Sequence, residues 1–304
     1  MAMPEGSLAP CARFVNRMSP DLAAKIAAIG RVIDREATAP LFAPLHGAEP
    51  YAGVKITRDI AYGPAERQRL DVFQVDGATG ARPVLIFVHG GGFTGGTKHT
   101  PGSPFYDNVP LWAARNGLVG VNMTYPLAPE AMWPSASENI SRAVRWVREQ
   151  IADFGGDPSS VFLFGHSAGA THAATYAAFP QFHGPDGPGL AGLILMSGIY
   201  DIATFPAAPN LRAYFGEDRS RDAERSTITG LLKQPAPMMI VAAELEPPPF
   251  TEQFDRLTTA LEASGIRPRT LTLPQHSHLS IGYAIGTADT RLTDQILDFV
   301  RMRR

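Results

Sequence analysis

The sequence predicts an α/β fold in which helices cover both faces of a mostly parallel central sheet. From residue 84 onward, short runs of consecutive apolar residues, which are typical of strands buried on both faces, alternate with segments of helical periodicity. Ahead of them, two strand candidates joined by a Gly-Pro turn predict an antiparallel hairpin. The chain contains no internal repeat and no low-complexity tract, so its 304 residues predict a single domain, residues 1–304.

Residues 1–50 predict a small helical cap before the sheet. Ser19-Pro20-Asp21 is typical of a helix start, and apolar residues recur at helical spacing from Leu22 to Ile33. We expect one helix that runs to about Ala37 and is ended by Pro40. This segment either covers the mouth of an active site or packs on the main domain.

Five strands are predicted from the hairpin to the segment that carries the site. Val54–Ile60 and Arg69–Val75 form the hairpin. Val84–Val88 is apolar throughout and predicts a central strand, Leu118–Met123 predicts the next one, and Val161–Phe164 predicts the fifth.

Helices are predicted between these strands, and further elements follow them. Residues 108–116 predict one helix; Ser135 and Glu138 fit a capping box at the start of another, which has an apolar face as far as Ile151. Residues 202–234 are broken by prolines and a glycine, and we expect them to form an insert that shapes specificity. The remaining predicted elements are a helix at 170–179, strands at 190–197 and 238–243, a helix ended by Gly265, a strand at 270–273 and a final helix from Thr290.

One strand–turn–helix segment organises the predicted site. Gly165-His166-Ser167-Ala168-Gly169 fits the pattern G-x-S-x-G, with an apolar strand before it and an Ala-rich helix after it. The two glycines suit a strained turn, where bulkier neighbours would clash. Such a turn lifts the Ser167 hydroxyl above the sheet edge, at the start of a helix whose dipole favours negative charge. Ser167 is therefore the predicted nucleophile.

A glycine-rich loop follows the predicted central strand. His89-Gly90-Gly91-Gly92 matches the oxyanion-hole signature of lipases and esterases, because glycines let backbone N–H groups point at one spot. We expect Gly91, Gly92 and Ala168 to donate to an oxyanion. A phosphate-binding loop is disfavoured because the pattern G-x-x-x-x-G-K-[ST] is absent from the sequence.

The HGGGF and GHSAGA motifs, with Tyr125-Pro-Leu-Ala-Pro-Glu130 between them, resemble the α/β-hydrolase carboxylesterases, in the branch around hormone-sensitive lipase and the feruloyl-esterase-like enzymes. The likeness extends from about residue 54 to the C-terminus. It implies the α/β-hydrolase fold and hydrolysis of small carboxylic esters through an acyl-enzyme, with no cofactor and no metal. Two positions depart from the branch: His166 precedes the nucleophile where Asp is commoner, and the acid is a Glu where Asp is usual.

The resemblance also implies a base and an acid in later loops. The family's histidine follows the last strand, where His276 and His278 both stand, and the family pattern of His, an apolar residue and a small residue fits His278 better. Glu246 precedes a proline as the family's carboxylate does, while Glu244 and Asp201 are the alternatives. The order of nucleophile, acid and histidine along the chain is the one expected for this fold.

The other histidines and the large aromatic residues have structural interpretations. His89, His166 and His172 are expected to support the fold, and His276 is expected to face solvent if it is not the base. Core packing is also the commoner role for aromatic side chains. Five of them are nevertheless candidates for lining the substrate pocket: Phe93, Trp133, Tyr200, Phe205 and Phe215.

Composition and charge narrow the class of function. The net charge of −2 gives no positive field that would attract nucleic acid, and the sequence contains no polybasic segment that would bind an anionic membrane. No apolar run approaches the roughly 18 residues of a membrane span, and the first twenty residues lack the apolar core of a signal peptide. We therefore expect a cytoplasmic protein whose partner is a small-molecule ester, and in which Cys11 is an incidental thiol.

Two other functions compete with the esterase. An amidase or arylformamidase would use the same three catalytic groups, and a non-catalytic small-molecule receptor would use the same scaffold. Such receptors commonly lose the base, whereas histidine candidates are present here. Members of this family often form homodimers, so a homodimer is compatible with the resemblance.

Overall fold

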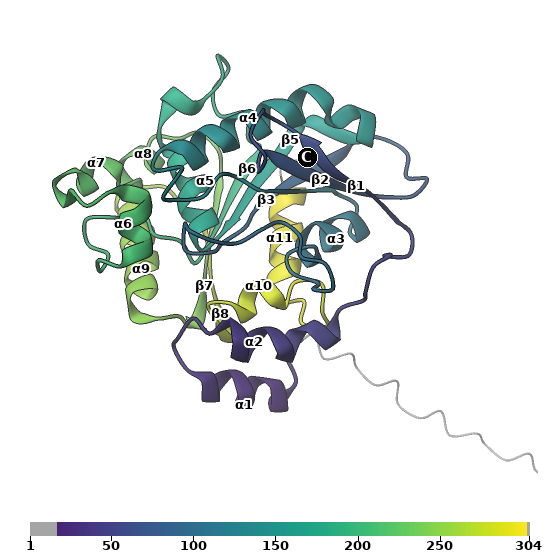
Figure 1. Ribbon diagram of the computed structural model, residues 1–304, viewed down its shortest axis with the longest axis horizontal. Helices are drawn as coiled ribbons and strands as arrows, with labels where there is room; N and C mark the ends of the chain where they lie inside the picture. Colours follow the sequence, from purple (N-terminus) through teal and green to yellow (C-terminus); the bar gives the residue numbers. More distant parts are fainter. Residues whose placement is uncertain (1–16, 303–304) are drawn as a thin grey trace, which may run out of the picture.

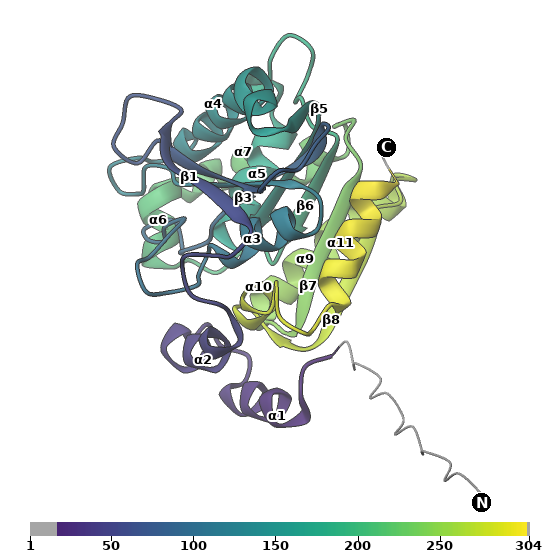
Figure 2. The same cartoon turned by 90° about the vertical axis from the view of Figure 1, so that its right-hand side faces the viewer.

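The computed structural model describes residues 17–302 and contains one eight-stranded sheet with helices on both faces (Figures 1 and 2). The strand order is β1-β2-β4-β3-β5-β6-β7-β8. β2 pairs antiparallel with both β1 and β4, and all other neighbours are parallel. This arrangement confirms the predicted fold class and its antiparallel hairpin. Cys11 lies outside the described residues.

The elements follow the predicted alternation of strands and helices. The strands are β1 (Val54–Ala61), β2 (Arg69–Val75), β3 (Arg82–Val88), β4 (Val119–Met123), β5 (Gly156–His166), β6 (Gly192–Met196), β7 (Met238–Leu245) and β8 (Arg269–Ser277). The α-helices are α1 (Pro20–Ile29), α2 (Arg35–Phe42), α3 (Asn108–Arg115), α4 (Ser135–Gln150), α5 (Ala168–Ala178), α6 (Pro209–Phe215), α7 (Asp222–Arg225), α8 (Ile228–Leu231), α9 (Pro248–Ala263), α10 (Ser280–Tyr283) and α11 (Arg291–Arg301).

The central strands are buried on both faces because successive side chains point to opposite sides of the sheet. In β3, Val84, Ile86 and Val88 belong to the core shared with α4, α5 and α9. Leu85 and Phe87 belong to the core shared with α3 and α11. Full burial of each such side chain contributes roughly 1.5–3 kcal/mol, so the two apolar layers hold the strand ends in place.

The N-terminal segment forms two helices rather than the single one expected. Gly30, with φ +82°, ends α1, and a new helix begins after Asp34, whose carboxylate accepts a hydrogen bond from the Ala37 N–H at 2.8 Å. Pro40 lies inside α2 instead of ending the helix. The expectation of one helix was wrong because a left-handed glycine and a second cap divide the periodic pattern.

The two N-terminal helices pack at one end of the molecule, beside β8 and α10 (Figure 1). Their buried side chains, among them Ile26 and Phe42, share an apolar cluster with Leu279 and Tyr283. The N-terminal segment therefore packs against the loop and short helix that follow β8, where the candidate histidines stand.

Three other boundaries differ from expectation. Pro134, not Ser135, occupies the cap position of α4 and makes no side-chain cap, so the predicted capping box is wrong. β5 begins at Gly156, several residues earlier than predicted, and β8 continues to Ser277, so that His276 belongs to the strand. Because β5 and β8 run parallel, the early start of β5 and the late end of β8 extend the sheet at opposite edges.

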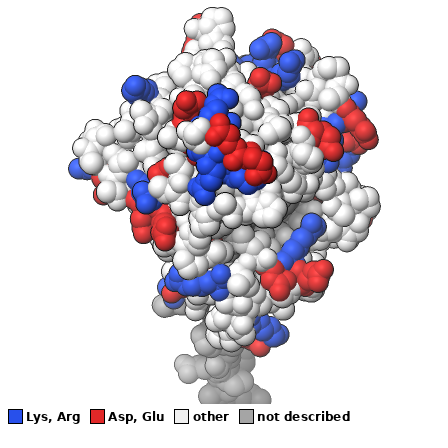
Figure 3. Space-filling model, turned by 60° about the vertical axis from the view of Figure 1, so that its left-hand side comes forward, with Lys and Arg blue, Asp and Glu red and all other residues white. Residues whose placement is uncertain are grey.

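Charges of both signs are interspersed on the face of the molecule drawn in Figure 3. On the face drawn in Figure 3, Lys and Arg side chains lie beside Asp and Glu in small mixed groups. One such pair joins Arg221 to Glu224 at 3.3 Å. Within residues 17–302, no helix is both long and apolar enough to cross a membrane.

Candidate active site

Ser167 stands on a strained turn between β5 and α5. Its backbone has φ +56° and ψ −124°, a region that residues other than glycine rarely adopt. A Cβ on Gly169 would overlap the Val88 carbonyl, and one on Gly165 would overlap the start of α5. The two glycines of the motif are therefore needed for steric reasons, and the serine is lifted to the C-terminal end of β5 as predicted.

Other residues in the left-handed region gather around the same turn. Phe93 (φ +70°) follows the glycine loop, Ser197 (φ +58°) follows β6, and Gln275 (φ +66°) precedes the histidines. With Ser167 they make four of the five non-glycine residues with positive φ in the described part of the chain. Strain of about 1–3 kcal/mol each is typical of sites whose geometry the surrounding fold enforces.

Three side chains from separate loops form a continuous hydrogen-bonded chain. His278 Nε2 lies 2.8 Å from Ser167 Oγ, and His278 Nδ1 lies 2.6 Å from Glu246 Oε2. Because a carboxylate only accepts, Nδ1 carries the proton that is donated to Glu246. In the neutral ring, Nε2 is then free to accept the proton of Ser167 Oγ. This is the arrangement that activates a serine hydroxyl as a nucleophile.

Glu246 is fully buried, and its surroundings hold it in the charged form. Burial alone would raise the pKa of Glu246, but the charge and hydrogen bond of His278, with hydrogen bonds from Ser197 and the Ala243 N–H, lower it below its ordinary value. Ser197 Oγ donates to Glu246 Oε1 at 2.5 Å, and the Ala243 N–H donates to the same oxygen at 3.2 Å. A buried carboxylate with these partners can orient the imidazole and stabilise its protonated form.

The alternative acids lie elsewhere. Glu244 accepts a hydrogen bond from the Gln275 N–H at 2.6 Å and is exposed. Asp201 accepts from Ser226 Oγ at 3.2 Å and faces Arg256. Among the described residues, neither carboxylate contacts His278.

His276 does not face solvent, which corrects the expectation from sequence. It is fully buried, with Nε2 3.1 Å from Asp289 Oδ2 and Nδ1 3.1 Å from Ser280 Oγ. The reason is that β8 runs on to Ser277, so His276 points into the packed layer beside α10.

The glycine loop approaches the serine closely. A Cβ on Gly90 would lie 2.9 Å from Ser167 Cβ, so only glycine fits there. In the described part of the chain, no hydrogen bond joins the N–H groups of Gly91, Gly92 or Ala168 to another residue. Ala168 is the first residue of α5, whose early N–H groups have no partner within the helix. These donors are available for an oxyanion, which remains a predicted role.

Three further histidines are buried and support the fold. Burial lowers the pKa of His89 to about 4 and the pKa values of His166 and His172 to about 3, so all three are neutral at pH 7. His166 Nε2 donates to the His278 carbonyl at 2.8 Å and thereby fixes the backbone of the base. His89 Nδ1 donates to the Gly90 carbonyl at 2.6 Å, and its ring stacks on Tyr125.

Ser167 opens onto a largely apolar cavity of about 400 Å³. Of the five aromatic residues predicted for a pocket, Phe93 and Phe205 line it. Trp133 packs beside Phe179, while Tyr200 and Phe215 are buried in the core, so these three do not line the cavity. Trp133 and Tyr200 lie in loops and Phe215 is the last residue of α6, and all three pack with the apolar core instead.

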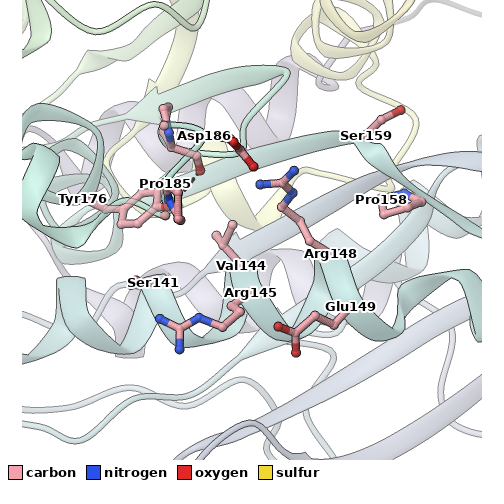
Figure 4. A pocket seen from close by; sticks show the side chains of 13 residues that line it. Ser141, Val144, Arg145, Arg148, Glu149, Pro158, Ser159, Tyr176, Pro185 and Asp186 are labelled. Carbon is pink, nitrogen blue, oxygen red and sulfur yellow. Dashed lines mark hydrogen bonds between the residues drawn. The ribbon is translucent and has the colours of Figure 1, made fainter.

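A second cavity lies at the opposite end of β5 and is larger, about 550 Å³ (Figure 4). It is lined by α4 and by the start of β5, and Figure 4 shows Arg148 reaching toward Asp186 across it. Its lining includes the hydroxyls of Ser141 and Ser159 but no histidine. Neither serine therefore has a base beside it there, and the smaller cavity is the candidate active site.

One group of residues has the composition of a metal site. Among the described residues, Glu49, His99 and Asp107 bring potential ligand atoms within 4.8 Å of one another. Arg58 already donates to Asp107 at 2.8 Å and also pairs with Glu49. Because a guanidinium occupies the position between the carboxylates, this group is an ion-pair network that ties β1 to the loop before α3.

Several residues of the site escaped sequence reasoning. Ser197 directly follows the apolar run of β6, and the rule that ligands gather at the C-terminal ends of parallel strands could have identified it. Phe250 covers His278, with ring centroids 4.4 Å apart, and Asn210 Nδ2 donates to the Gly92 carbonyl at 3.0 Å. No local pattern identifies these two contacts, because they join distant segments.

Comparisons with known proteins agree with this geometry. Esterase LipQ of Mycobacterium tuberculosis is 34% identical over 208 residues, which is 64% of this chain but only 47% of LipQ. Kynurenine formamidase of Danio rerio is 27% identical over 251 residues, with 80% of this chain and 81% of the relative covered. The solved structure of an esterase from Pyrobaculum calidifontis superposes with a TM-score of 0.68 at 18% identity, covering 94% of this chain and 98% of that one.

The structural likeness shows the fold, and the sequence relatives confirm the resemblance to esterases that the motifs indicated. A model of the α/β-hydrolase fold family matches residues 85–281, a stretch that includes the glycine loop, the Ser167 turn and the two histidines near the end of β8. This chain therefore belongs to the α/β-hydrolase fold family.

Proposed function

We propose that this protein is a serine carboxylesterase that hydrolyses small carboxylic esters through an acyl-enzyme. The observation that carries the proposal is the hydrogen-bonded chain from Ser167 through His278 to Glu246, opening on a cavity large enough for a small molecule. Its membership of a family whose relatives include named esterases supports the same conclusion.

In the first half-reaction, Ser167 Oγ attacks the ester carbonyl while His278 Nε2 accepts its proton. The N–H groups of Gly91, Gly92 and Ala168 hold the oxyanion, and each such donor contributes about 3–4 kcal/mol. Glu246 stabilises the imidazolium. The tetrahedral intermediate then collapses: the bond to the alcohol oxygen breaks, and His278 gives its proton to that oxygen.

In the second half-reaction, water replaces the alcohol. His278 takes a proton from the water as its oxygen attacks the acyl carbon, and the same donors hold the second oxyanion. The bond to Ser167 Oγ breaks, Oγ recovers the proton from His278, and the carboxylic acid leaves. The side chains end as they began, so the cycle needs no cofactor.

The test is turnover of 4-nitrophenyl acetate and butyrate by the wild type and by Ser167→Ala. We expect the variant to lose turnover and to fail to react with a fluorophosphonate, a probe that labels activated serines. Equal turnover by both proteins would contradict the mechanism. Absence of turnover in both, with no labelling of the wild type, would favour the non-catalytic receptor.

An arylformamidase is the second candidate, and one observation favours it. Kynurenine formamidases of Danio rerio and Salmo salar match this chain over about four fifths of its length and of their own. The match to LipQ, by contrast, covers only 47% of LipQ. The same three side chains can cleave an N-formyl amide if His278 protonates the leaving nitrogen. Comparing kcat/KM for N-formylkynurenine with that for 4-nitrophenyl acetate separates the two: a preference of more than tenfold for the amide would identify the formamidase.

A further inference from the structure

The cavity at Ser167 contains a single charged side chain. Arg35, the first residue of α2, lines it together with Ser167, whereas every other lining residue is neutral. In residues 17–302, Arg35 makes no ion pair, and no hydrogen bond from its guanidinium is found. A cation is thus held at the edge of an apolar cavity without a protein partner.

The stability of α2 gives no reason for an arginine at this position. The N-terminus of a helix carries partial positive charge, so a cation in the first turn is disfavoured by a few tenths of a kcal/mol. Asp34 uses its carboxylate to cap the Ala37 N–H, and neither it nor Glu36 pairs with Arg35. The position of Arg35 is explained better by what enters the cavity than by the helix.

Two tyrosines belong to the same cavity lining as Arg35. Tyr106 and Tyr283 both line the cavity, with ring centroids 5.9 Å apart. Burial raises the pKa of both phenols. At neutral pH both phenols keep their protons. The lining thus adds two phenol groups to the guanidinium and contains no acidic side chain.

The rest of the cavity wall is largely apolar, with Asn210 as its one amide side chain. Its apolar lining residues include Phe93, Phe205, Phe250 and Leu279. A ligand that fills the space therefore needs an apolar body, an ester carbonyl at Ser167 and a negatively charged hydrogen-bond acceptor at Arg35. The planar guanidinium fork matches the two oxygens of a carboxylate.

We propose that this site takes esters that carry a free carboxylate, which Arg35 binds while Ser167 attacks the ester carbonyl. The proposal rests on the esterase function proposed above and specifies its substrate class. The carboxylate takes no part in bond making or breaking, so its contribution is to binding and orientation. Because Arg35 is exposed, the pairing is screened by salt, and KM for a charged ester should rise with ionic strength.

The test uses two pairs of esters that differ only in charge. Mono-4-nitrophenyl adipate against 4-nitrophenyl hexanoate places the carboxylate on the acyl side, and 4-acetoxybenzoate against its methyl ester places it on the alcohol side. For each pair we measure the ratio of kcat/KM for the charged ester to kcat/KM for the neutral one. The ratio is taken on one preparation, so a change in the active fraction of a variant cancels.

We expect the ratio for one pair to fall about tenfold in Arg35→Met, a difference of 1.4 kcal/mol, chiefly through KM. The ratio should fall less in Arg35→Lys, which keeps the positive charge but loses the planar fork of the guanidinium. The matched control is Lys25→Met, because Lys25 lies on the neighbouring helix α1, pairs with Asp21 and does not line the cavity. Its ratios should equal those of the wild type.

Ratios that stay the same in Arg35→Met for both pairs would overturn the carboxylate proposal while leaving the esterase function intact, provided that the neutral esters are hydrolysed. A fall of the same size in Lys25→Met would also overturn it, since the effect would then be one of overall charge. If the wild type hydrolyses none of these esters, the esterase function itself fails, and this proposal fails with it.

Discussion

Two histidines near the end of β8, only two positions apart, each contact one serine and one carboxylate. For His278 the distances are 2.8 Å to the serine and 2.6 Å to the carboxylate, and for His276 both are 3.1 Å. Both rings are fully buried. We call the two sets the Ser167 group, which comprises Ser167, His278 and Glu246, and the Ser280 group, which comprises Ser280, His276 and Asp289.

The two groups differ in what their serines face. Ser167 is partly exposed to the cavity and lies beside backbone donors that have no partner. Ser280 is fully buried, and its Oγ accepts a hydrogen bond from the Ser277 N–H at 2.8 Å. The carboxylate of Asp289 is likewise occupied, because Arg291 Nε donates to it at 2.9 Å.

The contrast teaches that a serine, a histidine and a carboxylate in line do not by themselves make a catalytic site. The Ser280 group satisfies its hydrogen bonds internally and links β8 to the start of α11 and, through the Met18 N–H, to the N-terminal segment. The Ser167 group leaves its hydroxyl and the neighbouring N–H groups open to a ligand. Access of a ligand to the hydroxyl, and backbone N–H groups without a partner, distinguish the proposed catalytic group at Ser167 from the structural group at Ser280.

The largest expected effect is on the two serines. Ser167→Ala should lower kcat by about 10⁴-fold or more, since the nucleophile is lost. Ser280→Ala should leave kcat for 4-nitrophenyl butyrate within about tenfold and lower the melting temperature instead. Steady-state kinetics with thermal melts of both variants tests this, and equal losses of activity would erase the distinction between the groups.

The two histidines should separate in the same way. His278→Asn removes the base and should lower kcat by about 10⁴-fold with little change in stability. His276→Asn should cost about 1–3 kcal/mol in the free energy of unfolding, because a buried hydrogen bond to Asp289 is lost, and it should keep most of the activity. Kinetics and urea unfolding on the two variants check the pair; loss of chemistry in His276→Asn would assign it a catalytic role.

A smaller effect is expected from the carboxylate and its support. Glu246→Gln should lower kcat by about 10²–10⁴-fold, because the amide favours the wrong tautomer of His278. Ser197→Ala removes one hydrogen bond that lowers the pKa of Glu246 and should lower kcat by about tenfold. Steady-state kinetics compares the two losses of kcat. A loss in Ser197→Ala as large as that in Glu246→Gln would contradict the supporting role of Ser197.

The Ser280 group should also be visible in the acid dependence of stability. Burial alone would raise the pKa of Asp289, but hydrogen bonds from Arg291 and His276 hold it well below its ordinary value. The resulting stabilisation is present above the unfolded-state pKa of about 3.9 and is lost as pH falls toward the folded-state value. Asp289→Asn should therefore be less stable than the wild type at pH 7, with a gap that narrows on acidification. Urea unfolding at pH 7 and pH 3.5 measures this; a gap independent of pH would refute the assignment.

The smallest effect is expected from His172, a buried histidine that has no carboxylate partner in residues 17–302. Its effect on the pH dependence of stability serves as a control for that of Asp289. Burial lowers the pKa of His172 to about 3, and neither ring nitrogen has a hydrogen-bond partner among the described residues. Below an unfolded-state pKa of about 6.5 only the unfolded chain takes up the proton, so stability falls by about 1.4 kcal/mol per pH unit. His172→Leu should reduce the slope of unfolding free energy between pH 6 and pH 4.5 by that amount. An unchanged slope would mean that His172 is not neutral when folded.

Much of the fold could be predicted because it follows from local signals. The all-apolar run of β3 and the glycines flanking Ser167 are dictated by burial and by steric limits that a short window contains. The division of the N-terminal segment was missed because periodicity continues across Gly30, and only the second cap at Asp34 reveals the break. The missing capping box at Ser135 shows that a local pattern can be overridden by the chain before it.

The site was predictable to the extent that its residues sit in motifs. Ser167, Glu246 and His278 each follow a strand at the edge where ligands gather, and the structure brings them together. Arg35 and Asn210 could not be found this way, since their positions depend on how the N-terminal helices and α6 fold back over that edge. Sequence patterns located the proposed reacting groups, but the walls of the cavity required the tertiary structure.

The central claim is that only the Ser167 group activates its hydroxyl, and covalent labelling tests it most directly. The wild-type protein is treated with a fluorophosphonate probe, digested and mapped by mass spectrometry. The account predicts one adduct per chain, on Ser167, and none in His278→Asn. An adduct on Ser280, or labelling of Ser167 that persists at the same rate without His278, would contradict it.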